Sequence, residues 1–169
     1  MPIHPYDRSH LLTLKNPLFV KDLERFIMGG YKSDCEIGDV TENVMPNKQV
    51  SAVVMAKSPG VFCGGPLIKW FFKSLYNDFE VKINFDEGDD FKKGDIVLEI
   101  KALAPAILRA ERTLLNLMQR LCGIATTTHI YASKAYPTPV AATRKTLYGL
   151  LDKYAVSIGG GLTHRLNLG

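Results

Sequence analysis

Residues 140–146, Val-Ala-Ala-Thr-Arg-Lys-Thr, and residues 154–165, Tyr-Ala-Val-Ser-Ile-Gly-Gly-Gly-Leu-Thr-His-Arg, decide the fold class of this chain. In each stretch a short apolar run leads into a pair of cationic side chains. Short apolar runs bounded by turn signals are typical of buried parallel strands. The carboxyl ends of such strands meet at one edge of a sheet. The sequence therefore predicts the start of an α/β sheet or barrel whose strand ends converge on an anion.

Length, composition and cysteine usage exclude several classes of protein. The chain has 169 residues, 46% hydrophobic and 22% charged, so we expect a packed core rather than disorder. The net charge of +4 suits an anionic small substrate and is too small to indicate nucleic acid. Cys35, Cys63 and Cys122 lie far apart, which favours free thiols and a cytoplasmic protein. We expect neither a signal peptide nor an apolar run of the ~18 residues that would span a membrane.

The first two thirds of the chain predict an α+β domain with a mostly antiparallel, hammerhead-like sheet. The expected elements are a helix over 20–28 ended by Gly29-Gly30, a turn at 38–41, strands over 49–57, 81–85 and 96–100, and a helix over 67–76. We assign residues 1–108 to this N-terminal domain. Residues 109–169 are assigned to the first, incomplete part of an α/β barrel.

A long amphipathic helix is predicted after Pro105, a residue that suits the first turn of a helix. Its buried stripe is Ile107, Ala110, Leu114, Leu117 and Leu121, and its polar face includes Arg109, Arg112, Asn116 and Gln119. We expect Gly123 either to interrupt this helix or to mark a close approach, and a second helix to begin at Ala125. A short crossover helix is expected over 147–153, between the two barrel strands.

The cationic residues predict a pocket for a ligand with several negative charges: Arg144, Lys145, His164 and Arg165, with Arg112 as a possible fifth. The planar fork of arginine matches carboxylates and phosphates, and lysine adds a compact charge. The run Gly159-Gly160-Gly161 is either an anion-binding nest of N–H groups or a flexible turn. Solvated surface for Arg144-Lys145 and a structural histidine at His164 are the alternatives. Spacing and composition alone thus indicate an anion-binding α/β domain.

Four ordered motifs resemble the quinolinate phosphoribosyltransferase family. They are Glu111-Arg112-Thr113-Leu114-Leu115-Asn116, Gly123-Ile124-Ala125-Thr126, Thr143-Arg144-Lys145-Thr146 and the stretch from Lys153 to Arg165. Looser matches are Gly38-Asp39-Val40-Thr41, Ala56-Lys57 with Gly60, and Lys93-Gly94-Asp95. The sequence departs from the family at Ala142, where Asp is usual, at Leu147-Tyr148, where Thr-Pro is usual, and at Cys122, where Ser is commoner.

The resemblance implies phosphoribosyl transfer to quinolinate with decarboxylation, which gives nicotinate mononucleotide, pyrophosphate and CO2 in NAD biosynthesis. It implies substrate contacts by Arg112, Thr143, Arg144, Lys145, His164 and Arg165, with Lys145 as the catalytic residue. Phosphoribosyl pyrophosphate would be the co-substrate and Mg²⁺ the cofactor, with its protein ligands expected downstream of Gly169 and none in this chain. The family also implies a homodimer or higher homo-oligomer in which Arg112 is offered across the interface.

Two other interpretations stay open, and two further ones are not expected. The chain is expected to be inactive by itself, because the family's metal and phosphate-loop residues lie beyond residue 169, which would leave a non-catalytic anion-binding fragment. A related enzyme would act on nicotinate without decarboxylation. A carrier module is not expected, because no Met-Lys-Met or Asp-Lys-Ala tip is present. Nucleic-acid partners are not expected either, since no aromatic platform accompanies the cations. No membrane partner is expected, because no apolar run is long enough to span a membrane.

Overall fold

The computed structural model describes residues 4–35 and 46–166, so the turn expected at 38–41 lies outside the described residues. The helical elements are η1 (Ser9–Leu11, a 3-10 helix), α1 (Pro17–Leu23), η2 (Glu24–Met28, a π-helical turn), α2 (Gly29–Cys35), α3 (Gly65–Leu75), α4 (Ala104–Ala135) and α5 (Leu150–Ile158). The strands are β1 (Gln49–Met55), β2 (Gly60–Val61), β3 (Phe79–Ile83), β4 (Asp90–Phe91) and β5 (Ile96–Leu103). No helix in these two ranges is long and apolar enough to cross a membrane.

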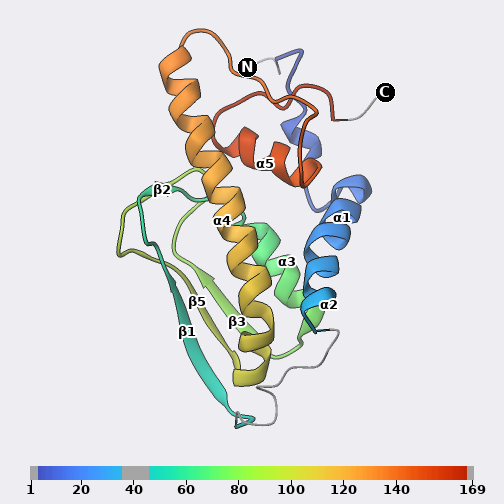
Figure 1. Ribbon diagram of the computed structural model, residues 1–169, viewed down its shortest axis with the longest axis vertical. Coiled ribbons are helices and arrows are strands. Elements are labelled where there is room, and N and C mark those ends of the chain that lie inside the picture. The colour runs from blue at the N-terminus through green and yellow to red at the C-terminus, as the bar shows by residue number, and fades with distance from the viewer. Residues whose placement is uncertain (1–3, 36–45, 167–169) are drawn as a thin grey trace.

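A three-stranded antiparallel sheet in the order β1-β5-β3 forms one side of the molecule (Figure 1). The central strand β5 turns buried residues toward the helices, among them Leu98, Ile100 and Ala102. The short strands β2 and β4 pair separately. This arrangement confirms the predicted antiparallel sheet. The strand expected over 81–85 begins two residues earlier, because its pairing with β5 starts at Phe79 opposite Ala102.

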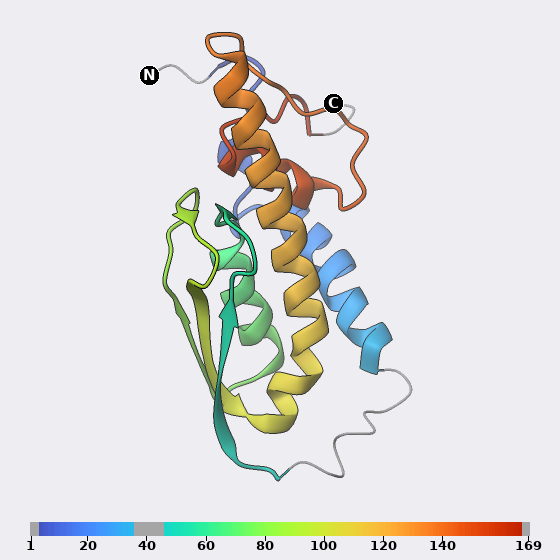
Figure 2. The same ribbon diagram turned by 60° about the vertical axis from the view of Figure 1, so that its left-hand side comes forward.

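The long helix α4 is the central element of the fold. Figure 2 shows it between the sheet and the α1–α2 segment, and contacts to β5 on one side and α2 on the other agree. The predicted stripe is confirmed: Ala110, Leu114, Leu117 and Leu121 are buried and Ile107 packs against the core. The interruption expected at Gly123 is wrong, because α4 runs unbroken to Ala135. Ala125 and Thr128 continue the buried stripe past the glycine, so packing keeps the segment helical.

The helix expected to end at Gly29-Gly30 continues to Cys35. The continuation is held by tertiary contacts of Tyr31, whose ring meets Phe71 edge-on and whose hydroxyl lies 3.0 Å from the Tyr76 hydroxyl. A glycine pair lowers helix propensity by about 1 kcal/mol per residue, an amount that such contacts readily exceed.

The strand expected over 154–158 is wrong, because these residues belong to α5. Leu151, Tyr154 and Ala155 are buried at helical spacing. An apolar run this short fits a buried helix as well as a buried strand, so its sequence does not distinguish the two. The parallel contact that the sequence predicted lies later, where Ala141 forms a parallel bridge with Leu162. The expected crossover helix is therefore α5, displaced by three residues at its start.

Glu87 ties the sheet region to α5. Its carboxylate accepts the N–H groups of Gly64 and Gly65 at the start of α3, the latter at 2.6 Å, and the hydroxyl of Tyr154 at 2.9 Å. Burial is the main cause that raises the pKa of both Tyr154 and the neighbouring Cys63 thiol, followed by the Glu87 charge. These bonds of Glu87 fix α5 relative to the N-terminal domain.

Gly159 offers a test of how closely α5 packs on α4. A Cβ at Gly159 would collide with the carbonyl oxygen of Ala125 and lie 2.8 Å from Cβ of Thr128. We expect Gly159→Ala to lower the free energy of unfolding by about 1–3 kcal/mol, as overpacking does. Urea unfolding followed by circular dichroism measures it.

Gly123→Ala is the control, because Gly123 is exposed within α4 and a Cβ there meets nothing within 4 Å. We expect this change to stabilise the fold by about 0.5–1 kcal/mol. Equal stability of Gly159→Ala and the wild type would contradict the observed packing.

Candidate anion-binding site

Two parallel chain segments end side by side and carry the cations. Ala142 donates its N–H to the carbonyl of Leu162 at 2.8 Å, and Leu162 donates to the carbonyl of Val140 at 2.8 Å. Arg144 follows the first segment and Arg165 follows the second. The pairing therefore brings the two arginines to one edge of the incipient parallel sheet, where ligands of α/β folds bind.

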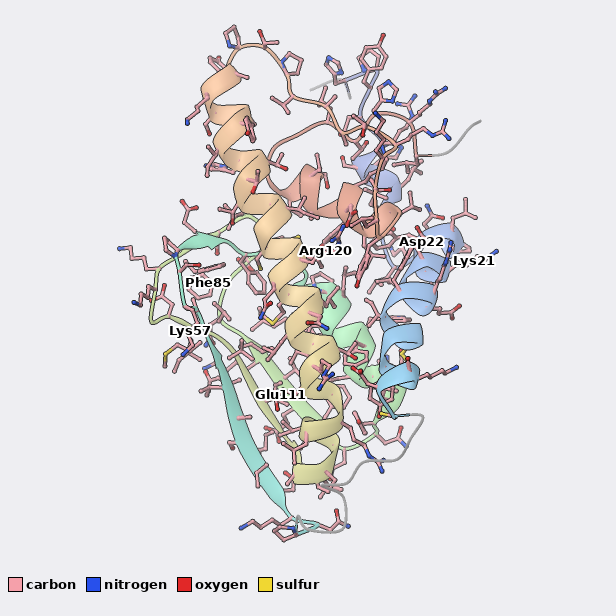
Figure 3. All side chains as sticks on the ribbon, viewed as in Figure 1. Lys21, Asp22, Lys57, Phe85, Glu111 and Arg120 are labelled. Atoms are coloured by element: carbon pink, nitrogen blue, oxygen red, sulfur yellow. The ribbon has the colours of Figure 1, made fainter. Side chains whose placement is uncertain are left out.

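A cavity of about 580 Å³ lies at this edge. Six cationic side chains line it, namely Arg8, Lys21, Arg25, Arg144, Lys153 and Arg165, together with a single carboxylate, Asp22. Figure 3 labels Lys21 and Asp22 on α1, which contacts α5. A cavity with this balance of charge attracts anions and rejects cations.

Lys153 is the buried member of the set, with 2% of its surface exposed. Its Nζ donates to the carbonyl oxygen of Thr163 at 2.6 Å, which fixes the end of the second segment just before Arg165. Burial, and then the nearby charge of Arg144, lower the pKa of Lys153. The sequence motif contains this lysine, but sequence reasoning gave it no function.

The N-terminal segment closes over the same strand end. Arg8 donates its backbone N–H to the Thr163 hydroxyl at 2.6 Å, and that hydroxyl donates to Oδ1 of Asp7 at 3.2 Å. Burial would raise the pKa of Asp7, but hydrogen bonds from Ser9 and Thr163 outweigh it and lower the value. These bonds bring the side chain of Arg8 to the cavity wall.

The other predicted site residues lie outside the cavity lining. His164 has a φ of 54°, donates its N–H to the carbonyl of Tyr6 at 2.7 Å and stacks its ring on that tyrosine. Left-handed backbone in a residue other than glycine is uncommon and gathers at functional sites. Lys145 and Thr143 are exposed, and the Thr143 hydroxyl accepts the N–H of Lys145 at 3.1 Å. Arg112 is exposed on α4, 3.9 Å from a carboxylate oxygen of Asp34.

The three glycines do not form an anion nest. The N–H groups of Gly159, Gly160 and Gly161 donate to carbonyls of α5 at Ala155, Ser157 and Val156. Gly160 has a φ of 86°, so the run is a Schellman-type end of the helix. The nest hypothesis is wrong because all three donors are already used, and the alternative of a turn holds.

The loop between Arg144 and α5 is held by two carboxylates. Asp152, with 8% of its side chain exposed, accepts two hydrogen bonds of 2.7 Å from Arg120 on α4 and also the N–H groups of Leu147 and Tyr148. Asp22 accepts the N–H of Leu150 at 2.8 Å. The Arg120 guanidinium lies 4.4 Å from the centre of the Tyr148 ring, and Figure 3 shows Arg120 on the part of α4 near α5. The loop that carries Arg144 is therefore rigidly attached to three helices.

Sequence reasoning missed four of the six cavity cations: Arg8, Lys21, Arg25 and Lys153. Lys21 and Arg25 belong to the helix expected over 20–28, and both are exposed, so each looks like an ordinary solvent-facing residue. The approach of this helix to Arg144 depends on contacts far apart in sequence, such as Asp22 with Leu150. The one signal in the sequence was Lys153, a charged residue within an otherwise buried turn of α5, and it pointed to a functional lysine there.

Comparison with known proteins identifies relatives along most of the chain. Family models described as the N-terminal and C-terminal domains of quinolinate phosphoribosyl transferase match residues 39–122 and 124–169. A probable nicotinate-nucleotide pyrophosphorylase (carboxylating) of Bacillus subtilis is 36% identical over 151 residues, covering 86% of this chain and 52% of that protein. Quinolinate phosphoribosyltransferase (decarboxylating) 1b of Nicotiana tabacum is 36% identical over 152 residues, covering 87% of this chain and 43% of that protein.

A solved structure agrees with the sequence comparison. The nicotinate-nucleotide pyrophosphorylase from Francisella tularensis superposes with a TM-score of 0.81 at 28% identity, covering 88% of this chain and 55% of that chain. The similarity confirms the predicted fold class, an α+β N-terminal domain followed by the start of an α/β barrel. The chain spans about half the length of the curated relatives it matches.

Asp152 provides a test of the loop attachment. Asp152→Asn leaves the guanidinium of Arg120 without its charge partner, and we expect a loss of about 3 kcal/mol in the free energy of unfolding. The loss should be smaller in an Arg120→Met background, which a double-mutant cycle in urea measures. Glu111→Gln is the control, because it neutralises an exposed carboxylate on α4, the helix that carries Arg120. Equal losses in both backgrounds would contradict the pairing.

The buried Lys153 predicts a pH-dependent difference in stability. Because its pKa is lowered from 10.5 in the folded state, the unfolded chain binds more protons as the pH approaches 10.5. The wild type should therefore gain stability relative to Lys153→Met as the pH rises from neutral toward 10.5. Urea unfolding of both proteins across that range measures it, with Lys69→Met on α3 as baseline. Parallel profiles would contradict the buried, lowered state of Lys153.

Proposed function

This chain belongs to the quinolinate phosphoribosyltransferase family, and we propose that its cation-lined cavity binds quinolinate for phosphoribosyl transfer with decarboxylation. In that reaction quinolinate and phosphoribosyl pyrophosphate give nicotinate mononucleotide, pyrophosphate and CO2, a step of NAD biosynthesis. Names of the matched relatives describe this activity for those proteins. The chain would thus act as a glycosyltransferase.

The position of Arg144 and Arg165 carries the proposal. Quinolinate has two adjacent carboxylates on one ring, so it needs two cations that point toward the same place. The parallel bridge between Ala141 and Leu162 supplies this convergence, because each arginine follows one of the paired segments and both line one cavity. An arginine fork binds a carboxylate through two hydrogen bonds, which also fixes the orientation of the ring.

The chemistry asks the protein for positioning and charge rather than for a nucleophile. The bond between C1 of the ribose and the pyrophosphate oxygen breaks, and its electron pair leaves with pyrophosphate. The pyridine nitrogen attacks the oxocarbenium-like C1 and becomes a positively charged pyridinium. When the 2-carboxylate departs as CO2, its bonding electron pair stays on ring C2, where the adjacent positive nitrogen stabilises it, and a proton from solvent then completes C2. Cations that hold the ring place its nitrogen for attack and stabilise the charges that develop.

Lys145 and His164 are proposed to act from the rim of the cavity. Lys145 is exposed next to Arg144, where its long side chain is free to contact the phosphoribosyl donor. His164 directly precedes Arg165 and has a left-handed backbone, and we propose that both residues contact the substrate. Thr143 supports Lys145 through its hydroxyl.

Mg²⁺ is proposed as a companion of the donor rather than as a resident ion. Residues 4–35 and 46–166 contain no cluster of three or more His, Cys, Asp or Glu side chains that would hold a metal. The one carboxylate in the cavity, Asp22, is already bonded to a backbone N–H. The described residues therefore do not fit a protein-held metal, whereas Mg²⁺ commonly binds through substrate phosphates.

We propose a cytoplasmic homodimer or higher homo-oligomer that binds neither nucleic acid nor membranes. The support for the dimer is the location of Arg112, which is 76% exposed at its side chain on α4 and lines no part of the basic cavity. An arginine at this position is better placed to contact a ligand bound to a second copy of the chain than a ligand in the cavity of its own chain.

Calorimetric binding of quinolinate to the 169-residue chain tests the proposal. We expect Arg144→Ala and Arg165→Ala each to weaken binding by about 10- to 100-fold, the value of a charge-assisted hydrogen bond. Lys69→Ala, which removes one exposed charge from α3, should leave the affinity within twofold.

Nicotinate separates the second candidate function from the first. It carries one carboxylate, so we expect it to bind at least tenfold more weakly than quinolinate. Equal binding of the two compounds would favour a related pyridine phosphoribosyltransferase. Failure of both to bind at millimolar concentration would contradict the assignment of the cavity.

A further inference from the structure

Three consecutive residues near the start of the chain hold the end of the second cationic segment, and we call them the N-terminal clasp: Tyr6, Asp7 and Arg8. The Thr163 hydroxyl accepts the backbone N–H of Arg8 at 2.6 Å and donates to Oδ1 of Asp7 at 3.2 Å. The carbonyl of Tyr6 accepts the N–H of His164 at 2.7 Å. The clasp therefore holds the two residues that lead into the cavity arginine of this segment.

The Asp7 carboxylate is itself oriented by its own segment. Ser9 donates its N–H to Oδ1 of Asp7 at 3.1 Å and its hydroxyl to Oδ2 at 2.6 Å. The Thr163 hydroxyl also lies 3.3 Å from the carbonyl oxygen of His164, but a carboxylate is the stronger acceptor for its single proton. Thr163 is fully buried and its carbonyl accepts Nζ of Lys153, so this residue is held from two sides.

His164 has a backbone conformation that needs support from outside its own segment. Its φ of 54° lies in the left-handed region, which is unfavourable for residues other than glycine and persists where surrounding contacts enforce it. Tyr6 supplies these contacts: its carbonyl holds the His164 N–H, and its ring stacks on the imidazole with 5.6 Å between ring centres and 17° between planes. A change in this dihedral angle would redirect the next residue, Arg165, whose side chain lines the cavity.

We propose that Tyr6 and Asp7 are positioning residues, which hold the end of this segment so that Arg165 points into the cavity. Neither residue is among those that line the cavity, so neither is expected to touch the ligand itself. This inference rests on the proposed function, in which Arg165 binds a carboxylate of the substrate. A clasp that only stabilised the fold would leave the affinity of the folded chain unchanged, so ligand binding separates the two roles.

The direction of the effect distinguishes positioning from charge. Asp7 is an acidic residue next in sequence to Arg8, which lines the cavity, so on charge alone its removal should strengthen the binding of an anion. Positioning predicts the opposite. Once the strand end is released, Arg165 samples directions that miss the ligand, and the cost of ordering it is subtracted from the binding free energy.

Calorimetric titration of the 169-residue chain with quinolinate tests the clasp. We expect Asp7→Ala to weaken binding by about 5- to 10-fold, whereas the control Asp90→Ala, which removes an exposed carboxylate from β4, should stay within about twofold. In an Arg165→Ala background, Asp7→Ala should cost less than about twofold, because the group that it positions is gone. Thr163→Val should weaken binding as Asp7→Ala does, and Thr163→Ser, which keeps the hydroxyl, should restore the affinity to within about threefold of wild type.

Proton NMR of the His164 ring gives a readout that needs no ligand. The ring current of Tyr6 shifts the imidazole protons of a stacked histidine, so Asp7→Ala should move these resonances toward those of an unstacked one. Tyr6→Leu, which removes the ring and keeps the backbone carbonyl, should produce the largest shift. His129, exposed on α4, is the internal control and should not move.

The outcomes separate the clasp from the proposed function. Unchanged or tighter quinolinate binding by folded Asp7→Ala, or the same loss with and without Arg165, would overturn the positioning role. Unchanged His164 resonances in both Asp7→Ala and Tyr6→Leu would overturn it as well. Failure of the wild type to bind quinolinate would instead reject the proposed function, and the His164 resonances would then decide on the clasp alone. Circular dichroism identifies any unfolded variant, in which case Thr163→Val against Thr163→Ser and the spectrum of Tyr6→Leu decide.

Discussion

The ion pair between Arg120 and Asp152 is the contact on which the geometry of the cavity depends. It joins the long central helix to α5 through two bonds of 2.7 Å, and the same carboxylate holds two backbone N–H groups of the preceding loop. The next residue, Lys153, carries the opposite charge and fixes the second strand end through Thr163. Two consecutive side chains of one short helix thus position both segments from which the arginines project.

Six cationic side chains and one carboxylate line the cavity, and five of the six cations are exposed. Lys153 is the buried one, and it is held by its bond to the Thr163 carbonyl rather than by a carboxylate. An anion bound in the proposed way would stabilise the folded chain by mass action, because it would bind the folded state and not the unfolded one.

Much of this fold follows from periodicity, and the errors have common physical causes. The α4 stripe and the antiparallel sheet were predictable because long patterns leave little ambiguity. Gly29, Gly30 and Gly123 were treated as helix ends, yet packing of Tyr31 in one case and of Ala125 in the other exceeded the cost of glycine. The short run at 154–158 fits both a helix and a strand, and only its contacts decide between them.

The site was predictable only where the sequence itself concentrates its cations. Arg144 and Arg165 stand in motifs and could be found, whereas Lys21 and Arg25 look like ordinary surface residues on a helix. Their approach to the cavity depends on Asp22 meeting Leu150, a contact between residues 128 positions apart. No local pattern records a contact of that kind.

The bond between Arg8 and Thr163 has a consequence for how the chain matures during its synthesis. The two residues are 155 positions apart, so a ribosome adding about 5–20 residues per second exposes Arg8 roughly 8–30 s before its partner exists. During that interval the N-terminal segment has helix α1 beside it, but the segment that ends at Thr163, to which it binds in the folded chain, has not yet been made. The cavity wall that this segment provides therefore forms only after Thr163 has been translated, 155 positions after Arg8.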